Sequence, residues 1–289
     1  MTFNLSFLRH AGAHAGLAMS AFLLSAVAEP TPPPSLQWFQ RLGAEAQDLV
    51  PAPGGGWFLT GGFHGLGRIA ETSPVSVGQG DLFLARFDAL GRLQWIRTAG
   101  GAGDEVGRRL AVDQQGNIAV LGLARGGSDG IRIAFGSTEI STPGDTAPFI
   151  ARYTSGGQLL WARIQEGVVD ADLLSGDASG TLVFSGRDAS GAPLLRSLAA
   201  GDGQVRWSVA PGGPGRTEIT SLTSAPDGST WIGCTTLGAT RFGSFLPASD
   251  GTLLVRLGAG GLFQGVNRLG PGITRIGQMA FDPSGNLLL

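Results

Sequence analysis

The chain has 289 residues, of which 42% are hydrophobic and 15% are charged, and its formal net charge is −2. A chain of this length can form one large β domain or two small ones. The nearly neutral charge excludes an electrostatic preference for nucleic acid or for an anionic membrane surface. Glycine accounts for 49 residues without the three-residue period of collagen. This composition favours many short strands joined by glycine-containing turns.

The N-terminus has the pattern of a secretory signal peptide over Met1–Ala28. Arg9 supplies the positive charge, an apolar run follows at 17–27, and Ala26-Val27-Ala28 fits the small-residue cleavage rule. The apolar run is short for a membrane span. We therefore expect cleavage before Glu29, a secreted or cell-surface protein, and no membrane span after cleavage. An uncleaved N-terminal anchor is the alternative.

The mature chain is expected to hold one domain preceded by a spacer. Residues 29–34 contain the run PTPPP, which predicts a stiff, extended spacer. Residues 35–289 are assigned to a repeat domain. The single cysteine, Cys234, excludes an internal disulfide. We expect Cys234 to be a small buried side chain rather than a reactive thiol.

The stretch Asp81–Gly122 contains the strand pattern that recurs along the chain. Four short, largely apolar segments are separated by turns in which Gly allows positive φ and Asp can bond its own backbone. No segment of the mature chain shows convincing helical spacing, so we predict an all-β fold. The four expected strands are 82–87, 93–97, 109–112 and 118–121.

Three sequence markers recur in constant order at a period near fifty residues. Such units must stack on their neighbours, and radial stacking of four-stranded units gives a β-propeller. A β-sandwich is the rival, but it would not need the same markers in every unit. The first marker is a Trp at 38, 95, 161 and 207, with Gln264 in the equivalent place. The second is a turn followed by a strand, at 53–61, 113–122, 177–186, 226–234 and 282–289. The third is an apolar strand, at 81–88, 148–154, 193–198 and 252–258.

The segment FLARFDALGRLQWIRTAGGAGDEVGRRLAVDQQGNIAVLG, residues 83–122, resembles the SBBP-type β-propeller repeat of bacterial secreted and surface proteins. The likeness is also good in PFIARYTSGGQLLWARI and in MAFDPSGNLLL, and it fades near Trp207 and Gln264. It covers nearly all of residues 35–289. The resemblance implies a propeller fold and no particular ligand.

Both ends of the repeat domain predict an incomplete ring. Leu289 corresponds in register to Val120, in the middle of a strand, and Ser35–Arg41 predicts a lone outer strand of the kind that closes a last blade. The markers indicate about four full blades plus partial ones, and the resemblance suggests about seven blades in the intact ring. We therefore expect a fragment, truncated at its C-terminus, of a longer propeller.

The sequence gives no positive sign of catalysis. His64 is the one histidine of the mature chain, and no G-x-S-x-G motif accompanies it. The carboxylate pairs Asp104/Glu105 and Asp170/Asp172 do not have calcium-loop spacing, and the first belongs to the repeat. We expect no catalytic residue, no metal and no cofactor. The repeated Trp residues and the arginines at 86, 152, 196 and 256 are expected to have structural roles.

A ligand site is expected on one face of the propeller. In an up-and-down blade, the second-to-third and fourth-to-first connections share a face, and here these connections are the long, variable ones. Phe135-Gly136 and Phe242-Gly243 recur within two of them, so part of each is expected to be repeat structure. The candidate ligand-binding residues are His64, Arg68, Glu71, Asp104, Glu105, Arg125, Asp129 and Asp145.

Three functions fit these patterns. The first is a non-catalytic secreted or cell-surface propeller that binds or scaffolds an extracellular protein or glycan. The second is an extracellular glycan-active hydrolase or lyase that uses loop carboxylates on one face, which rests on fold analogy alone. The third is a structural segment of a large adhesin.

Overall fold

The computed structural model describes residues 42–126, 129–246, 250–270, 272–282 and 284–289, and this part of the chain is all-β. The all-β expectation is confirmed. No helix among the described residues is long and apolar enough to cross a membrane. The expected signal peptide, the proline-rich spacer, and the strand Ser35–Arg41 with Trp38 lie outside the described residues.

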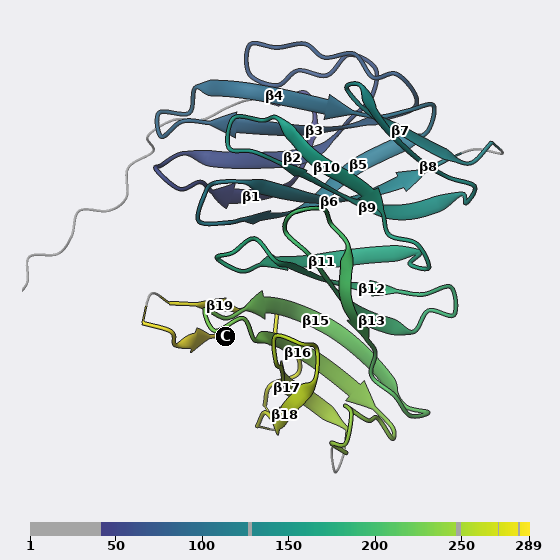
Figure 1. Ribbon diagram of the computed structural model, residues 1–289, viewed down its shortest axis with the longest axis vertical. Coiled ribbons are helices and arrows are strands. Elements are labelled where there is room, and N and C mark those ends of the chain that lie inside the picture. The colour runs from purple at the N-terminus through teal and green to yellow at the C-terminus, as the bar shows by residue number, and fades with distance from the viewer. Residues whose placement is uncertain (1–41, 127–128, 247–249, 271, 283) are drawn as a thin grey trace, which may run out of the picture. The chain divides into compact units, whose positions relative to one another are not determined.

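Four antiparallel sheets of four strands follow one another along the chain (Figure 1). The first sheet contains β1 (Glu45–Pro51), β2 (Trp57–Phe63), β3 (Asp81–Phe87) and β4 (Leu93–Ala99). The second contains β5 (Asp104–Val112), β6 (Ile118–Arg125), β9 (Thr146–Tyr153) and β10 (Leu159–Ile164). The third contains β11 (Asp170–Gly176), β12 (Leu182–Arg187), β13 (Pro193–Leu198) and β14 (Val205–Val209). The fourth contains β15 (Arg216–Ser224), β16 (Thr230–Leu237), β17 (Gly251–Leu257) and β18 (Phe263–Arg268).

Two small hairpins accompany these sheets. β7 (Ile131–Phe135) and β8 (Thr138–Thr142) are inserted between β6 and β9, and β19 (Ala280–Phe281) pairs with β20 (Leu287–Leu288). In the described residues the sheets form an open series that does not close into a ring. The expected strands are present, although β5 begins five residues earlier than the expected 109. The stretch Asp81–Gly122 spans the last two strands of one sheet and the first two of the next.

The turns at one end of each sheet form as their Asp and Gly residues predict. Between β5 and β6, Asp113 N donates to Asn117 O at 3.0 Å and Gly116 N donates to Asp113 O at 3.0 Å. The Asp113 carboxylate also accepts a bond from Asn117 N at 2.8 Å. Gly116 has a φ of 79°, a conformation that side chains other than Gly disfavour. The turn between β3 and β4 closes in the same way, with Asp88 as its first residue.

The first and second sheets bury both faces of their inner strands. In β3, Leu82 and Leu84 belong to the core between the first and second sheets, whereas Phe83 and Ala85 belong to a separate core on the other face. The side chains of β6 alternate in the same way. Val120 belongs to the core between the first and second sheets, and the residues on either side of it belong to the core between the second and third sheets. Burial on both faces explains why these strands are almost continuously apolar.

Successive sheets pack through their first strands. β5 contacts β1, β2 and β3 of the preceding sheet, and β11 contacts β5, β6 and β9. β15 in turn contacts β11, β12 and β13. Figure 1 shows β11–β13 between the second and fourth sheets. The first strand of each sheet therefore lies where the sheets meet.

A tryptophan on the fourth strand ties each of the first three sheets to the next one. The indole Nε1 of Trp95, Trp161 and Trp207 donates to a carbonyl in the β3–β4-type turn of the following sheet, at 3.0, 2.9 and 2.9 Å respectively. The ring lies against a glycine of that turn, where an added Cβ would fall within 2.6 to 2.9 Å of a ring atom. Since these glycines also have positive φ, the contact needs Trp on one sheet and Gly on the next. The tryptophans pack between the sheets, as expected.

Two assignments of register from the sequence were wrong by one position. Trp95 pairs with Arg86 across the sheet, and in the fourth sheet Arg256 pairs with Gly265, so Gly265 and not Gln264 is the Trp equivalent. In the third sheet Trp207 pairs with Ser197, so Arg196 does not share the position of the other three arginines. The turn before Val205 is one residue longer than its counterparts, and this length is not evident from the strand pattern.

The inter-sheet contact of Trp161 provides a test of the packing. Replacing this ring, which is 8% exposed, by Ala should lower the free energy of unfolding by about 3–5 kcal/mol, and Trp161→Phe by about 1–2 kcal/mol through loss of the hydrogen bond. Urea denaturation measures both values. The control is Leu160→Ala on the same strand, which should change stability by less than about 0.5 kcal/mol because Leu160 is 48% exposed. Equal losses for Trp161→Phe and Leu160→Ala would contradict the contact.

One repeated arginine forms a buried ion pair within the second sheet and also bonds the third sheet. The side chains of Arg152 and Asp113 are 5% and 2% exposed, and Arg152 Nη2 donates to Asp113 Oδ2. Arg152 Nη1 also donates to Gly180 O at 2.6 Å and to Ala200 O at 3.0 Å in the third sheet. At the equivalent position, Arg256 pairs with Asp227 at 2.7 Å, but there the side chains are 40% and 57% exposed.

These two pairs offer a matched comparison of burial. Arg152→Met leaves Asp113 buried without its charge partner and should cost about 3–5 kcal/mol. Arg256→Met breaks an exposed pair and should cost less than about 1 kcal/mol. Thermal and urea denaturation of the two variants checks the difference. Similar losses would show that burial does not decide the strength of the pair at this repeat position.

Candidate functional site

The connections on one edge of the sheets are long, as expected, with one exception. Strand alternation brings the β2–β3, β6–β9 and β16–β17 connections to the same edge as the fourth-to-first connections. The β12–β13 connection at this edge is only a short turn over 188–192. Part of two long connections is repeat structure, as predicted. Phe135 packs edge-on against Phe149 at 5.7 Å, and Phe242 packs edge-on against Phe263 at 5.6 Å.

Three of the predicted ligand-binding residues come together on this edge. His64 follows β2, Asp104 begins β5 and Arg125 ends β6, and all three line a pocket of about 250 Å³. Arg125 Nη1 lies 3.4 Å from Asp104 Oδ2. The pocket also includes Glu45, Gln47, Gly62, Val106 and Arg108. Its polar, partly charged lining suits a ligand that makes several hydrogen bonds.

The geometry of the pocket depends on Gly80, which has no side chain. A Cβ on Gly80 would lie 2.5 Å from Asp104 Oδ1 and 2.7 Å from His64 Nδ1, so glycine lets these two side chains approach. His64 Nδ1 lies 2.8 Å from Gln79 O. Since a carbonyl can only accept, Nδ1 is the donor in this bond.

Glu105 lies below the pocket rather than in it. Its side chain is buried, and Oε2 accepts a hydrogen bond from Gly101 N at 2.8 Å. Glu105 N donates to Gly80 O at 2.9 Å, which joins the start of β5 to the end of the β2–β3 connection. The pKa of the Glu105 carboxyl is raised to about 7, chiefly by burial and to a smaller extent by the charges of Asp81 and Asp104, whereas the bond from Gly101 opposes the shift. Glu105 therefore organises the loop rather than contacting a ligand.

The other four predicted site residues do not line this pocket. Arg68 forms a backbone bridge with Gly43, and Glu71 lies in the tight turn between Ile69 and Thr72. Asp129 and Asp145 are exposed in the connection that carries the β7–β8 hairpin. Of the eight residues predicted to form one ligand site, three therefore line a common pocket and the other five do not.

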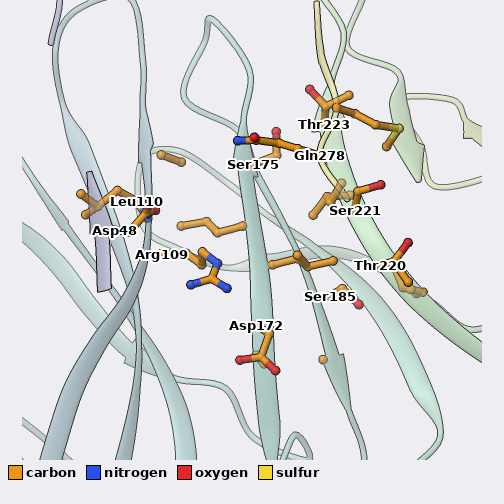
Figure 2. A pocket seen from close by; sticks show the side chains of 18 of the residues that line it. Asp48, Arg109, Leu110, Asp172, Ser175, Ser185, Thr220, Ser221, Thr223 and Gln278 are labelled. Atoms are coloured by element: carbon orange, nitrogen blue, oxygen red, sulfur yellow. The ribbon is translucent and has the colours of Figure 1, made fainter. Parts of the chain in front are cut away.

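A larger cavity lies among the first strands, and the sequence did not indicate it. Its volume is about 910 Å³, and β1, β5, β11, β15 and residues 275–279 contribute to its lining. Figure 2 shows Asp48 and Leu110 on one side of it and Thr220 and Ser221 on the other, with Arg109 and Asp172 between them. Asp48 Oδ2 accepts a bond from Leu110 N at 2.8 Å, and Ser175 Oγ accepts one from Ser224 N at 2.9 Å. Side chains in the cavity thus connect neighbouring first strands.

Each first strand carries a β-bulge at the same place. The register shifts across Gln47, Arg108, Asp172 and Thr220. A bulge bends the strand and redirects its side chain. Arg108 Nη1 consequently reaches Asp170 Oδ1 at 2.6 Å and Asp172 Oδ1 at 2.9 Å in the next sheet. The bulge also brings Gln47 and Arg108 into the pocket with His64, which the alternating pattern of the sequence could not reveal.

Cys234 and a metal site are the two remaining candidates for chemistry. Cys234 is buried, as predicted, and burial raises the pKa of its thiol to about 12. Among the described residues, no group of three or more His, Cys, Asp or Glu side chains could hold a metal ion.

Comparison with known proteins adds no family to this geometry. No protein-family model matches the chain, and no curated protein matches it.

The buried Glu105 predicts a pH dependence of stability. Its folded-state pKa of about 7 exceeds the ordinary 4.5, so between these values the folded chain holds a proton that the unfolded chain releases. The contribution of Glu105 to stability should therefore be greatest below the ordinary pKa and decrease as the pH rises to about 7, by on the order of 2 kcal/mol. Glu105→Gln should remove this decrease, and Glu71→Gln, at an exposed loop position, should retain it. Urea denaturation at about pH 5 and pH 8 measures both. An unchanged decrease in Glu105→Gln would contradict the assignment.

Proposed function

We propose that the chain is a non-catalytic, exported binding module of the β-propeller type. The face-to-face packing of four-stranded sheets, with their first strands around a common cavity, supports blade-like units. The repeated Trp contacts hold each sheet to the next, as a rigid scaffold requires. The SBBP-type resemblance of residues 83–122 and the signal-peptide pattern of Met1–Ala28 support a location outside the cell or on its surface.

The ligand in this proposal is an extracellular protein or glycan bound at the edge with the long connections. The observation that carries it is the convergence of His64, Asp104 and Arg125 in one polar pocket from three different elements. The opposite edge consists of short turns, in which backbone bonds already occupy the carbonyl and amide groups of the turn. Ligand sites commonly occur in loops on a rigid scaffold, so the long-connection edge is the better candidate.

The carboxylate geometry favours binding over glycan hydrolysis. A glycosidase needs two carboxylates that face each other across the scissile bond. Asp170 and Asp172 both accept hydrogen bonds from Arg108. Asp104 lies beside Arg125, and Glu105 is buried beneath Gly101. Each pair is therefore engaged in contacts within the protein.

A binding screen followed by substitutions on each edge tests this function. The full chain is screened against extracellular glycans and proteins, and the ligand found is titrated with variants. His64→Ala and Arg125→Gln should each weaken binding about tenfold, which corresponds to about 1.4 kcal/mol. The control is Arg92→Gln in the turn after Asp88, on the opposite edge, where the side chain is 71% exposed. Loss of binding in Arg92→Gln with unchanged binding in the other two variants would show that the wrong edge has been assigned.

A further inference from the structure

A second polar groove lies on the long-connection edge, between the third and fourth sheets. Its volume is about 670 Å³, within the roughly 300–1,000 Å³ range of small-molecule sites. The groove exists because the β12–β13 connection is a tight turn, in which Asp188 N donates to Ala192 O at 3.0 Å. At the same edge the corresponding connections of the other sheets, 64–80, 126–145 and 238–250, are much longer. The third sheet therefore has no long connection at this edge, and the groove opens beside its short turn.

The groove carries positive charge that the protein does not neutralise. Arg187 Nη1 donates to the Gly191 carbonyl at 3.0 Å and makes no ion pair within the described part of the chain. Arg216, at the start of β15, is exposed and has no carboxylate partner among the described side chains. The acid in the lining, Glu218, lies 3.9 Å from Arg275. Two guanidinium groups are thus available to a ligand, and guanidinium groups bind carboxylates in a bidentate manner.

The rest of the groove lining consists mainly of serine, threonine and glycine residues. Thr217 is only 7% exposed and its Oγ1 is buried, so this hydroxyl is closed to the groove. Ser190 is exposed and Thr235 is half-buried. The lining includes the hydroxyl residues Ser190, Thr217, Thr235, Thr236 and Thr240, and the glycines Gly191, Gly212, Gly213 and Gly215.

We propose that this groove binds an acidic oligosaccharide, with Arg187 and Arg216 holding its carboxylates. The large apolar side chain in the lining is Leu237, and no aromatic residue lines the groove. This lining suits a polyhydroxylated ligand better than an acidic peptide, whose affinity would require apolar pockets for its side chains. The groove uses the third and fourth sheets, whereas the His64 pocket uses the first two, so each can be tested without the other.

Isothermal titration of the full chain with defined oligosaccharides tests the proposal. The probes are tetrasaccharides of galacturonate, of mannuronate and of hyaluronan, each beside its carboxyl-reduced counterpart, which has the same chain without the charge. At least one acidic probe should bind, and its reduced counterpart should bind about tenfold more weakly or not at all. Arg187→Gln and Arg216→Gln should each weaken binding about tenfold.

The matched control is Arg206→Gln, an exposed β14 arginine outside the groove whose Nη1 bonds Thr181 Oγ1 at 3.3 Å. This variant should bind the acidic probe as the parent chain does. Unfolding temperatures within about 2 °C of the parent would show that each variant is folded. The proposal is overturned if none of the acidic probes binds, if a reduced probe binds equally well, or if Arg206→Gln weakens binding as much as the groove variants. Tighter, Arg187-dependent binding of a glutamate tetrapeptide would overturn the choice of an oligosaccharide.

Discussion

The contact between a tryptophan of one sheet and a turn glycine of the next is the interaction on which the rest of the structure depends. The glycine has positive φ and no side chain, so the indole ring can lie on the turn and donate to a nearby carbonyl. A four-stranded sheet with two apolar faces cannot be stable alone, and this contact fixes how its neighbour covers it. The contacts are Trp95 on Gly157, Trp161 on Gly203, and Trp207 on Gly261.

This fixed stacking decides where binding can occur. The first strands of successive sheets meet around the cavity of about 910 Å³, and their bulges direct side chains such as Arg108 toward the next sheet. The same stacking places all the long connections on one edge. The His64 pocket forms where the β2–β3 connection meets the start of β5 and the end of β6. The acidic-sugar groove that we propose lies where one connection is short.

The sequence predicts those features that arise from local chemistry. The Asp113 and Asp88 turns were correct because Asp and Gly determine a turn within five residues, and the strands were correct because apolar runs between such turns leave few alternatives. Features that arise between sheets were missed. The Arg108 bulge is not visible in an alternating pattern, and the extra turn residue before Val205 led to the wrong position for Arg196. Gln264 was placed one residue too early although its turn has the usual length. The eight candidate site residues were predicted to lie on one edge of the sheets, but a common edge did not bring all of them close together.

Hydrogen exchange of the indole N–H groups tests the inter-sheet contact most directly. The account predicts slow, native-state exchange for Trp95, Trp161 and Trp207, whose Nε1 groups bond carbonyls of the next sheet. Trp57 and Trp231 serve as internal references, because their indole groups make no such bond within the described residues. Two-dimensional NMR in deuterated buffer resolves these five signals from one another and from that of Trp38 once each Trp has been assigned by substitution with Phe. Exchange of the three bonded indoles at the rate of the two references would contradict the account.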